Sequence, residues 1–125
     1  MQVVGDILDL EECVALQHKD KYFDVIVISF VLTSLARLPD FSCIVELMKE
    51  GGQLIIANAA PDMTKAKPYY DFEIDGKSIA LNTVPVYPED LMSILMKLSL
   101  TPILVEPINN QNGERYSNIL IFEKK

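Results

Sequence analysis

A strand, a helix and a second strand between Tyr22 and Asn58 constrain the fold more than any other part of the sequence. The first strand is predicted within Val25–Leu32, where Ser29 is the one polar side chain. Because apolar and polar residues do not alternate in this run, we expect a strand covered on both faces. Such strands lie inside parallel sheets, so the run predicts a sheet with helices packed against it.

The helix of this unit is predicted over Phe41–Lys49, where apolar side chains recur at the spacing of one buried helical face. Asp40 is expected to cap its N-terminus, and Gly51 to end it in the left-handed conformation that glycine tolerates. Gln53–Asn58 then forms a second buried strand. A strand, a crossover helix and a strand make a βαβ unit. The chain is therefore predicted to be α/β with a mainly parallel sheet.

Shorter signals predict the remaining elements. A strand is expected to end near Gly5, and Asp75-Gly76 predicts the tight turn of a β-hairpin. Pro88 is expected at the first position of a further helix. Ile103–Val105 is predicted as a strand, and Tyr116–Glu123 as a last strand that alternates, as an antiparallel strand near a sheet edge does.

The longest stretch without periodicity is Ala59–Asp71, and loops of this length are usually functional or mobile. It lies between the second strand of the βαβ unit and the hairpin. We therefore expect it to contribute to whatever site the domain carries.

Length and charge limit the function. The 125 residues predict a single domain, 1–125, and the net charge of −7 repels nucleic-acid phosphates and anionic lipids. No apolar run approaches the roughly 20 residues that span a bilayer, and no signal peptide is recognisable. We therefore expect no nucleic-acid or membrane partner and a cytoplasmic location, where Cys13 and Cys43 would be small buried side chains.

No self-contained catalytic set stands out from the residues alone. His18 is the one histidine and lies in a polar connection, and cysteine and histidine do not cluster as in a zinc site. None of the five glycines has the spacing of a GxGxxG or phosphate-binding loop. The residues by themselves thus predict an α/β domain with a long loop and no metal.

The order of three short motifs extends this interpretation. Val3–Ile7, then Tyr22–Ser29, a helix, and then Leu47–Ala57 with its Gly-Gly pair resemble the third, fourth and fifth strands of the class I S-adenosylmethionine-dependent methyltransferases. A following loop, a helix at Pro88 and a closing strand pair extend the resemblance over nearly the whole chain. It implies a truncated Rossmann-like methyltransferase fold with an antiparallel C-terminal strand.

The resemblance assigns site residues by position. Asp6 and Ile7 correspond to the acidic residue and the following N–H that contact the adenine of S-adenosylmethionine, and the alternative for Asp6 is a turn residue. Ser29 and Phe30 end the fourth strand, beside cofactor and substrate, and a structural role is the alternative for each. Ligands of parallel sheets bind beyond the carboxyl ends of the strands, which adds Asn58. Further along the chain, the resemblance implies substrate contacts for three loop residues: Asp62, Tyr69 and Tyr70.

In the family, a first strand, a glycine-rich cofactor loop and a second strand come before the part that this chain resembles. The resemblance therefore implies the C-terminal portion of a methyltransferase acting on a small molecule, incomplete and inactive alone. The alternatives are a non-catalytic methyltransferase-like interaction or scaffold domain, and a ligand-binding domain that shares only the fold. Exposed apolar strand edges promote association, so a homo-oligomer or an N-terminal partner chain is expected to complete the sheet.

Overall fold

Four strands form the main sheet of the structure, a computed structural model that describes residues 6–8, 23–35 and 37–125. Their order across the sheet is β1-β2-β6-β5. Strand β1 pairs in parallel with β2, whereas β6 runs antiparallel to both of its neighbours, β2 and β5. The bounds are Phe23–Ser29 for β1, Met48–Ala59 for β2, Leu100–Asn109 for β5 and Arg115–Lys124 for β6.

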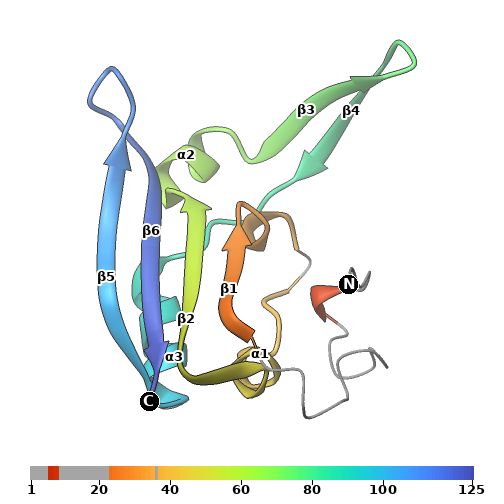
Figure 1. The fold of residues 1–125 in the computed structure, drawn as a ribbon. Helices are drawn as coiled ribbons and strands as arrows, with labels where there is room; N and C mark the ends of the chain where they lie inside the picture. Colours follow the sequence, from red (N-terminus) through yellow and green to blue (C-terminus); the bar gives the residue numbers. More distant parts are fainter. Residues whose placement is uncertain (1–5, 9–22, 36) are drawn as a thin grey trace.

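Three of these strands therefore point the same way, and only the C-terminal strand is reversed (Figure 1). This confirms the predicted α/β fold with an antiparallel C-terminal strand, in a sheet expected to be mainly parallel. Only one adjacent pair is parallel, because β6 lies between β2 and β5. Strand β5 forms one edge and tolerates Pro102 and Pro107, since a proline at an edge need not donate to a neighbouring strand.

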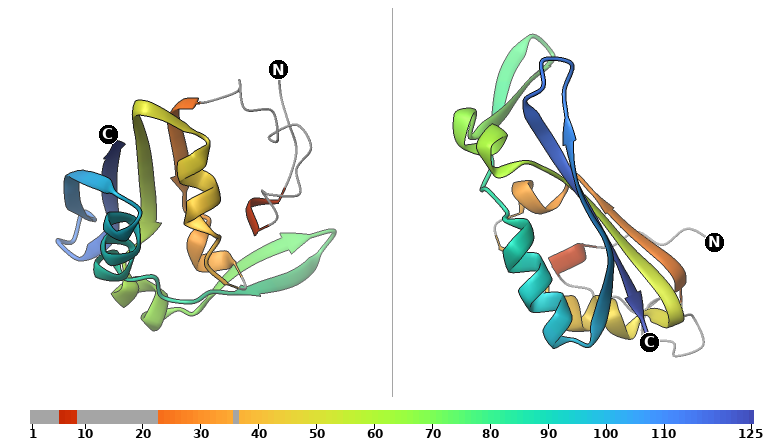
Figure 2. Two further views of the ribbon diagram at one scale, coloured as in Figure 1. Left: turned by 90° about the horizontal axis from the view of Figure 1, so that it is seen from below. Right: turned by 90° about the vertical axis from the view of Figure 1, so that its left-hand side faces the viewer.

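The helices that build the core lie on one face of the sheet (Figure 2). They are α1 at Phe41–Glu46 and α3 at Pro88–Lys97, together with the 3-10 turn η3 at Leu32–Ser34, which lies between β1 and α1. Leu54 and Phe122 of the sheet and Leu95 of α3 are completely buried between these layers. Helix α2, at Pro61–Ala66, follows β2 directly.

The opposite face of the sheet is not covered by any described helix (Figure 2). One row of directly opposed apolar residues crosses all four strands on this face: Val27, Ile55, Ile121 and Leu104. The side chain of Val27 is 60% exposed. The prediction that both faces of β1 are covered is therefore wrong for the described part of the chain, and the non-alternating run instead leaves an apolar surface.

Element boundaries follow local chemistry at the start of α1 but not at its end. Asp40 caps the helix as predicted, and its Oδ1 accepts a 3.0 Å hydrogen bond from the Ser42 N–H. The helix ends at Glu46, before the predicted Lys49, and β2 already begins at Met48. Gly51 does have a positive φ of 79°, but within the strand rather than after a helix.

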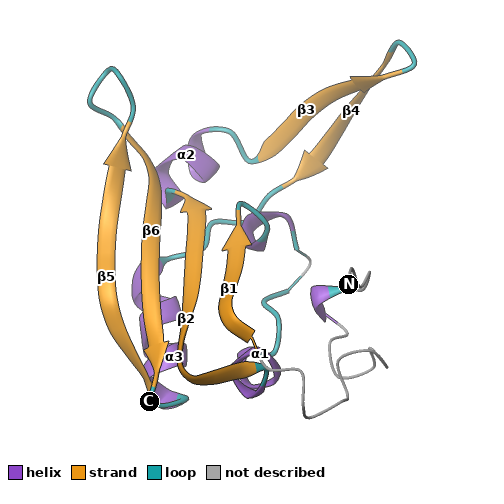
Figure 3. Cartoon of the chain, viewed as in Figure 1, coloured by secondary structure: helices purple, strands orange, loops and turns teal. Residues whose placement is uncertain are grey.

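A separate two-stranded hairpin confirms the turn predicted at Asp75-Gly76, both with positive φ (Figure 3). It consists of β3 at Tyr69–Ile74 and β4 at Lys77–Asn82, and it extends away from the main sheet. The N–H of Val84 donates a 2.8 Å hydrogen bond to the Thr33 carbonyl, which fastens the base of the hairpin to η3.

Three sequence expectations lie outside the described residues. These are the strand ending near Gly5, the buried position of Cys13 and the polar connection at His18. Cys43 is described and is half-buried on α1, less covered than the buried position expected for it.

Candidate functional site

Ser29 and Phe30 lie where predicted, at the carboxyl end of β1. Ser29 is exposed, and the Phe30 N–H donates a 2.7 Å hydrogen bond to the carbonyl of Ala57 on β2. Phe30 has a φ of 54°, in the left-handed region that a bulky side chain rarely adopts. Such strain is retained where the surroundings require a particular backbone path, and it is enriched at functional sites.

Tyr116, at the start of β6, completes an aromatic pair with Phe30. The two ring centroids lie 6.5 Å apart with an interplanar angle of 44°. The Tyr116 carbonyl accepts a 2.9 Å hydrogen bond from the Ala60 N–H, while Phe30 is bonded to Ala57. Both aromatic residues are thus attached to the end of β2, and both remain exposed. Sequence reasoning missed Tyr116, because only the β2–β6 pairing brings it there.

Asn58 lies between these two attachment points and is 2% exposed. Within the described part of the chain, neither its Nδ2 nor its Oδ1 has a hydrogen-bond partner, and the buried hydroxyls of Thr33 and Thr83 are also without one. A buried polar group without a partner costs about 1–3 kcal/mol. The carboxyl end of β2 therefore holds unused hydrogen-bonding capacity at the place where parallel sheets bind ligands.

Asp6 and Ile7 lie beyond β1, on the side away from β2 (Figure 1). Asp6 is exposed, and its Oδ1 accepts a 2.9 Å hydrogen bond from the Leu8 N–H, so the carboxylate at least closes a local turn. Ile7 packs against the core. Arg37 holds this segment in place, since its Nη2 donates to the Leu8 carbonyl at 3.3 Å.

The three predicted loop residues are all exposed but lie on different elements. Asp62 is in the first turn of α2, whereas Tyr69 and Tyr70 begin β3. Neighbouring residues of a strand point to opposite faces, so the two tyrosines cannot line the same side of the hairpin. Lys67 lies 5.6 Å from the centre of the Tyr69 ring. The hairpin thus separates side chains that the sequence places next to each other.

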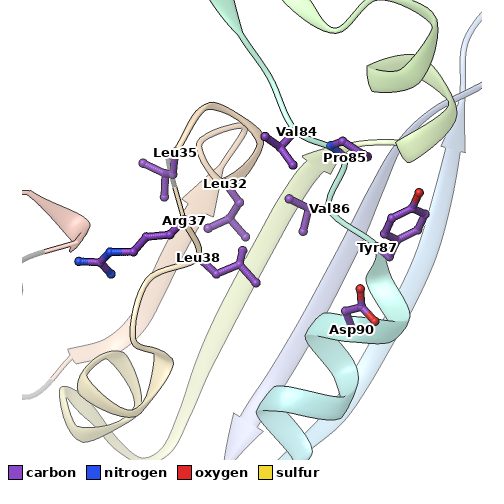
Figure 4. A pocket seen from close by; sticks show the side chains of 9 residues that line it. All are labelled: Leu32, Leu35, Arg37, Leu38, Val84, Pro85, Val86, Tyr87 and Asp90. Atoms are coloured by element: carbon purple, nitrogen blue, oxygen red, sulfur yellow. The ribbon is translucent and has the colours of Figure 1, made fainter.

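A pocket of about 220 Å³ opens between η3 and the N-terminus of α3 (Figure 4). None of its residues was singled out from the sequence. The signal available was the short apolar segment Val84–Tyr87, which contains Pro85 and comes just before Pro88. Its lining consists of Leu32, Leu35, Arg37, Leu38, Val84, Pro85, Val86, Tyr87 and Asp90.

Lys65 of α2 and Tyr87 meet at the rim of this pocket. The Lys65 Nζ lies 5.1 Å from the centre of the Tyr87 ring. A hydrogen bond to the Tyr87 side chain raises the pKa of Lys65 above its usual value. In residues 6–8, 23–35 and 37–125 there is no cluster of potential metal ligands, and no helix there could span a membrane.

No protein-family model and no curated relative matches the chain. Solved structures do. A S-adenosylmethionine-dependent methyltransferase from Clostridium acetobutylicum matches 98% of this chain with a TM-score of 0.65 and 12% identity. The N-methyltransferase NodS from Bradyrhizobium japonicum, with S-adenosylhomocysteine bound, matches 96% with a TM-score of 0.59 and 18% identity.

A third similar structure is the 1,6-didemethyltoxoflavin-N1-methyltransferase from Burkholderia thailandensis, holding 1,6-didemethyltoxoflavin and S-adenosylhomocysteine. It matches 84% of this chain with a TM-score of 0.53 and 14% identity. The fold is therefore the one found in S-adenosylmethionine-dependent methyltransferases, as predicted. The chain spans only 63%, 52% and 45% of the lengths of these three structures, respectively.

Proposed function

We propose that this chain is the C-terminal portion of an S-adenosylmethionine-dependent methyltransferase that acts on a small molecule, and that it is inactive alone. The observation that carries the proposal is the one-sided match. Up to 98% of this chain corresponds to a methyltransferase structure, but only 63% of that structure corresponds to this chain. The sheet face that no described helix covers, and the side of β1 that no described strand pairs with, support it, because a further portion has an apolar surface to cover.

The residues present fit one side of a cofactor site. Asp6 and Ile7 would hold the adenine, since the exposed Asp6 carboxylate has an oxygen beyond the one bonded to Leu8. Ser29 and Phe30 would form the wall beside the methyl group. S-adenosylmethionine, when bound, supplies an electrophilic methyl group, and the chain's own contribution is to position the acceptor.

The substrate side is assigned to Asn58, with Asp62, Tyr69 and Tyr70 on the covering elements. Asn58 has the strongest support, because both ends of its buried carboxamide lack a partner. The similar 1,6-didemethyltoxoflavin-N1-methyltransferase structure holds 1,6-didemethyltoxoflavin, which supports a small-molecule acceptor for this chain too.

A second candidate is a non-catalytic methyltransferase-like interaction domain. The observation in its favour is that no glycine pair in the 125 residues has the spacing of the cofactor loop. In either case we infer that a second copy or an N-terminal partner chain covers the side of β1 that has no neighbour among the described strands, because an exposed apolar edge promotes association.

Reading the DNA upstream of the Met1 codon separates the two candidates. The methyltransferase proposal expects an in-frame strand followed by Gly-x-Gly. A stop codon directly upstream, with no such segment encoded nearby, would overturn it in favour of the interaction domain.

Calorimetry with S-adenosylmethionine on the 125-residue chain tests how much of the cofactor site is present. We expect weak or undetectable binding, because the chain holds residues for the adenine end but no glycine-rich loop. Micromolar affinity would show that the residues present suffice, and loss of that affinity in Asp6→Ala would locate the adenine contact.

A further inference from the structure

The pocket beside α3 has an apolar body built from two segments that are far apart in the sequence. Leu32, Leu35 and Leu38 come from the connection after β1, and Val84–Val86 come from the connection before α3 (Figure 4). Leu32 is 2% exposed, so this wall continues directly into the hydrophobic core. The hydrogen bond from the Val84 N–H to the Thr33 carbonyl holds the two segments together. The pocket is therefore anchored to the core on both sides.

Its volume limits the ligand to one small ring. A cavity of about 150 Å³ lined by apolar side chains can take benzene. At about 220 Å³, this pocket has room for a six-membered ring with a short substituent. Drug-sized ligands usually need about 300 Å³ or more.

The charged side chains in and beside the pocket differ in whether they are available to bind a ligand. Asp90, in the first turn of α3, presents its carboxylate on the pocket side of the helix (Figure 4). The Arg37 guanidinium points away from the pocket and donates to the Leu8 carbonyl. The Lys65 ammonium is held by the Tyr87 side chain at the rim. Both positive groups thus have partners, whereas the Asp90 carboxylate makes no hydrogen bond or ion pair within the described residues, where only the Asp90 backbone N–H is bonded, to the Tyr87 carbonyl.

We propose that this pocket binds a small apolar ring that carries a protonated amine, with the ring against the leucine and valine wall and the ammonium group at Asp90. The net charge of −7 further favours a cation over an anion of the same shape. We infer the binding of such an amine from the pocket alone. Its role as the substrate to be methylated rests on the proposed function.

Three probes of nearly equal shape and different charge test the proposal on the 125-residue chain: benzylamine, benzyl alcohol and benzoate. Binding is followed by two-dimensional NMR of the Leu and Val methyl groups and of backbone amides. We expect benzylamine to shift the signals of Leu32, Leu35 and Val84. It should bind about two- to fivefold more tightly than benzyl alcohol, the factor that an exposed ion pair provides. Benzoate should bind most weakly.

Two substitutions with the same charge change form the matched control. Asp90→Asn should reduce benzylamine binding to the level of benzyl alcohol, which it should leave unchanged. Glu89→Gln, one residue earlier in the same turn but not in the pocket lining, should preserve the preference. Leu35→Phe should weaken both probes by filling the cavity.

Equal binding of the amine and the alcohol to the unmodified chain would overturn the proposal, as would equal effects of the two substitutions. Methyl shifts confined to residues outside the pocket would also overturn it. None of these results bears on the methyltransferase assignment, which depends on the upstream glycine loop. Conversely, absence of that loop would not affect the proposal that the pocket binds an amine.

Discussion

The Lys124 side chain donates a 2.9 Å hydrogen bond to the carbonyl oxygen of Met48, and through it the last strand reaches the first residue of β2, just after α1. The same Nζ donates to the Val45 carbonyl at 2.7 Å. The last carbonyls of a helix have no partner within the helix, and a lysine is a suitable one because its charge also complements the helix dipole. One partly buried side chain therefore joins β6 to the turn between α1 and β2.

Replacing Lys124 by methionine should lower the free energy of unfolding by about 1.5–3 kcal/mol, the range for hydrogen bonds to a charged group. Methionine keeps the length of the side chain but cannot donate. Urea unfolding followed by circular dichroism measures the change. Lys125→Met, at the exposed C-terminal neighbour, is the matched control and should change stability little. Equal effects of the two substitutions would show that the two hydrogen bonds do not contribute.

Replacing either of the adjacent glycines Gly51 and Gly52, near the start of β2, by alanine should lower stability, but for different reasons. A Cβ on Gly52 would lie 2.8 Å from the Lys49 carbonyl oxygen and 3.0 Å from that of Asp24, so β1 and β2 would have to separate. A Cβ on Gly51 meets no atom, but its φ of 79° is unfavourable for alanine. We expect Gly51→Ala to cost about 1–2 kcal/mol and Gly52→Ala about 1–3 kcal/mol.

Hydrogen exchange distinguishes the two mechanisms. Gly52→Ala should speed the exchange of β1 and β2 amides, because the crowding is between strands. Gly51→Ala should lower global stability without singling out β1. Selective loss of protection in β1 for Gly51→Ala alone would contradict this account.

Elements decided by local chemistry could be predicted from the sequence. Asp40 caps α1, Asp75-Gly76 makes the hairpin turn and Pro88 opens α3, because each acts within its own turn. The early start of β2 could not be predicted, since pairing with β1 and the close approach at Gly52 override the helical spacing after Glu46.

The site residues can be separated in the same way, into those that a local rule predicts and those that only tertiary contacts bring together. Ser29 and Asn58 follow from a general rule about strand ends, and the structure places both at such ends. Tyr116 contacts Phe30 only because of strand pairing. Asp90 lines the same pocket as Leu32 only because the hydrogen bond between Thr33 and Val84 holds their segments together. Contacts of that kind depend on tertiary structure, which no local pattern in this sequence encodes.

Two buried threonines allow a direct test of the unpaired hydroxyl groups. The Thr33 hydroxyl has no partner, whereas the Thr64 hydroxyl donates to the Ala60 carbonyl at 3.4 Å. Thr33→Val should therefore raise the free energy of unfolding by about 1 kcal/mol, and Thr64→Val should lower it by about 0.5–1 kcal/mol. Chemical denaturation of both variants measures the difference. A loss of stability in Thr33→Val would mean that a water molecule satisfies its hydroxyl.

Stability near α1 should depend on pH through Asp40. Hydrogen bonds from the Ser42 hydroxyl and N–H lower the pKa of Asp40 below its ordinary value of 3.8. A carboxylate with a lowered pKa stabilises the fold above its unfolded pKa, and this stabilisation is lost as the pH falls through the folded pKa. Asp40→Asn can still cap the helix but does not titrate.

The melting temperature of the unmodified chain should therefore fall more steeply than that of Asp40→Asn between pH 5 and the folded pKa of Asp40. NMR titration of the Asp40 carboxyl carbon gives that pKa directly. Ser42→Ala should move it back toward 3.8, because the Ser42 hydroxyl makes the largest contribution. Parallel melting curves for the two proteins would contradict the assignment.

The two edges of the sheet are protected to different degrees, which predicts where the chain associates. Strand β5 carries Pro102, Glu106 and Pro107, residues that discourage pairing with another strand. Val25–Ile28 of β1 has no proline and no charge. If another copy adds a strand at this edge, Val27→Lys should weaken concentration-dependent association in sedimentation velocity, because a charged side chain on an edge strand discourages pairing. Ile103→Lys on β5, where the side chain is 52% exposed, is the control and should leave association unchanged. An unmodified chain that stays monomeric across the concentration series would exclude a second copy and favour an N-terminal partner chain.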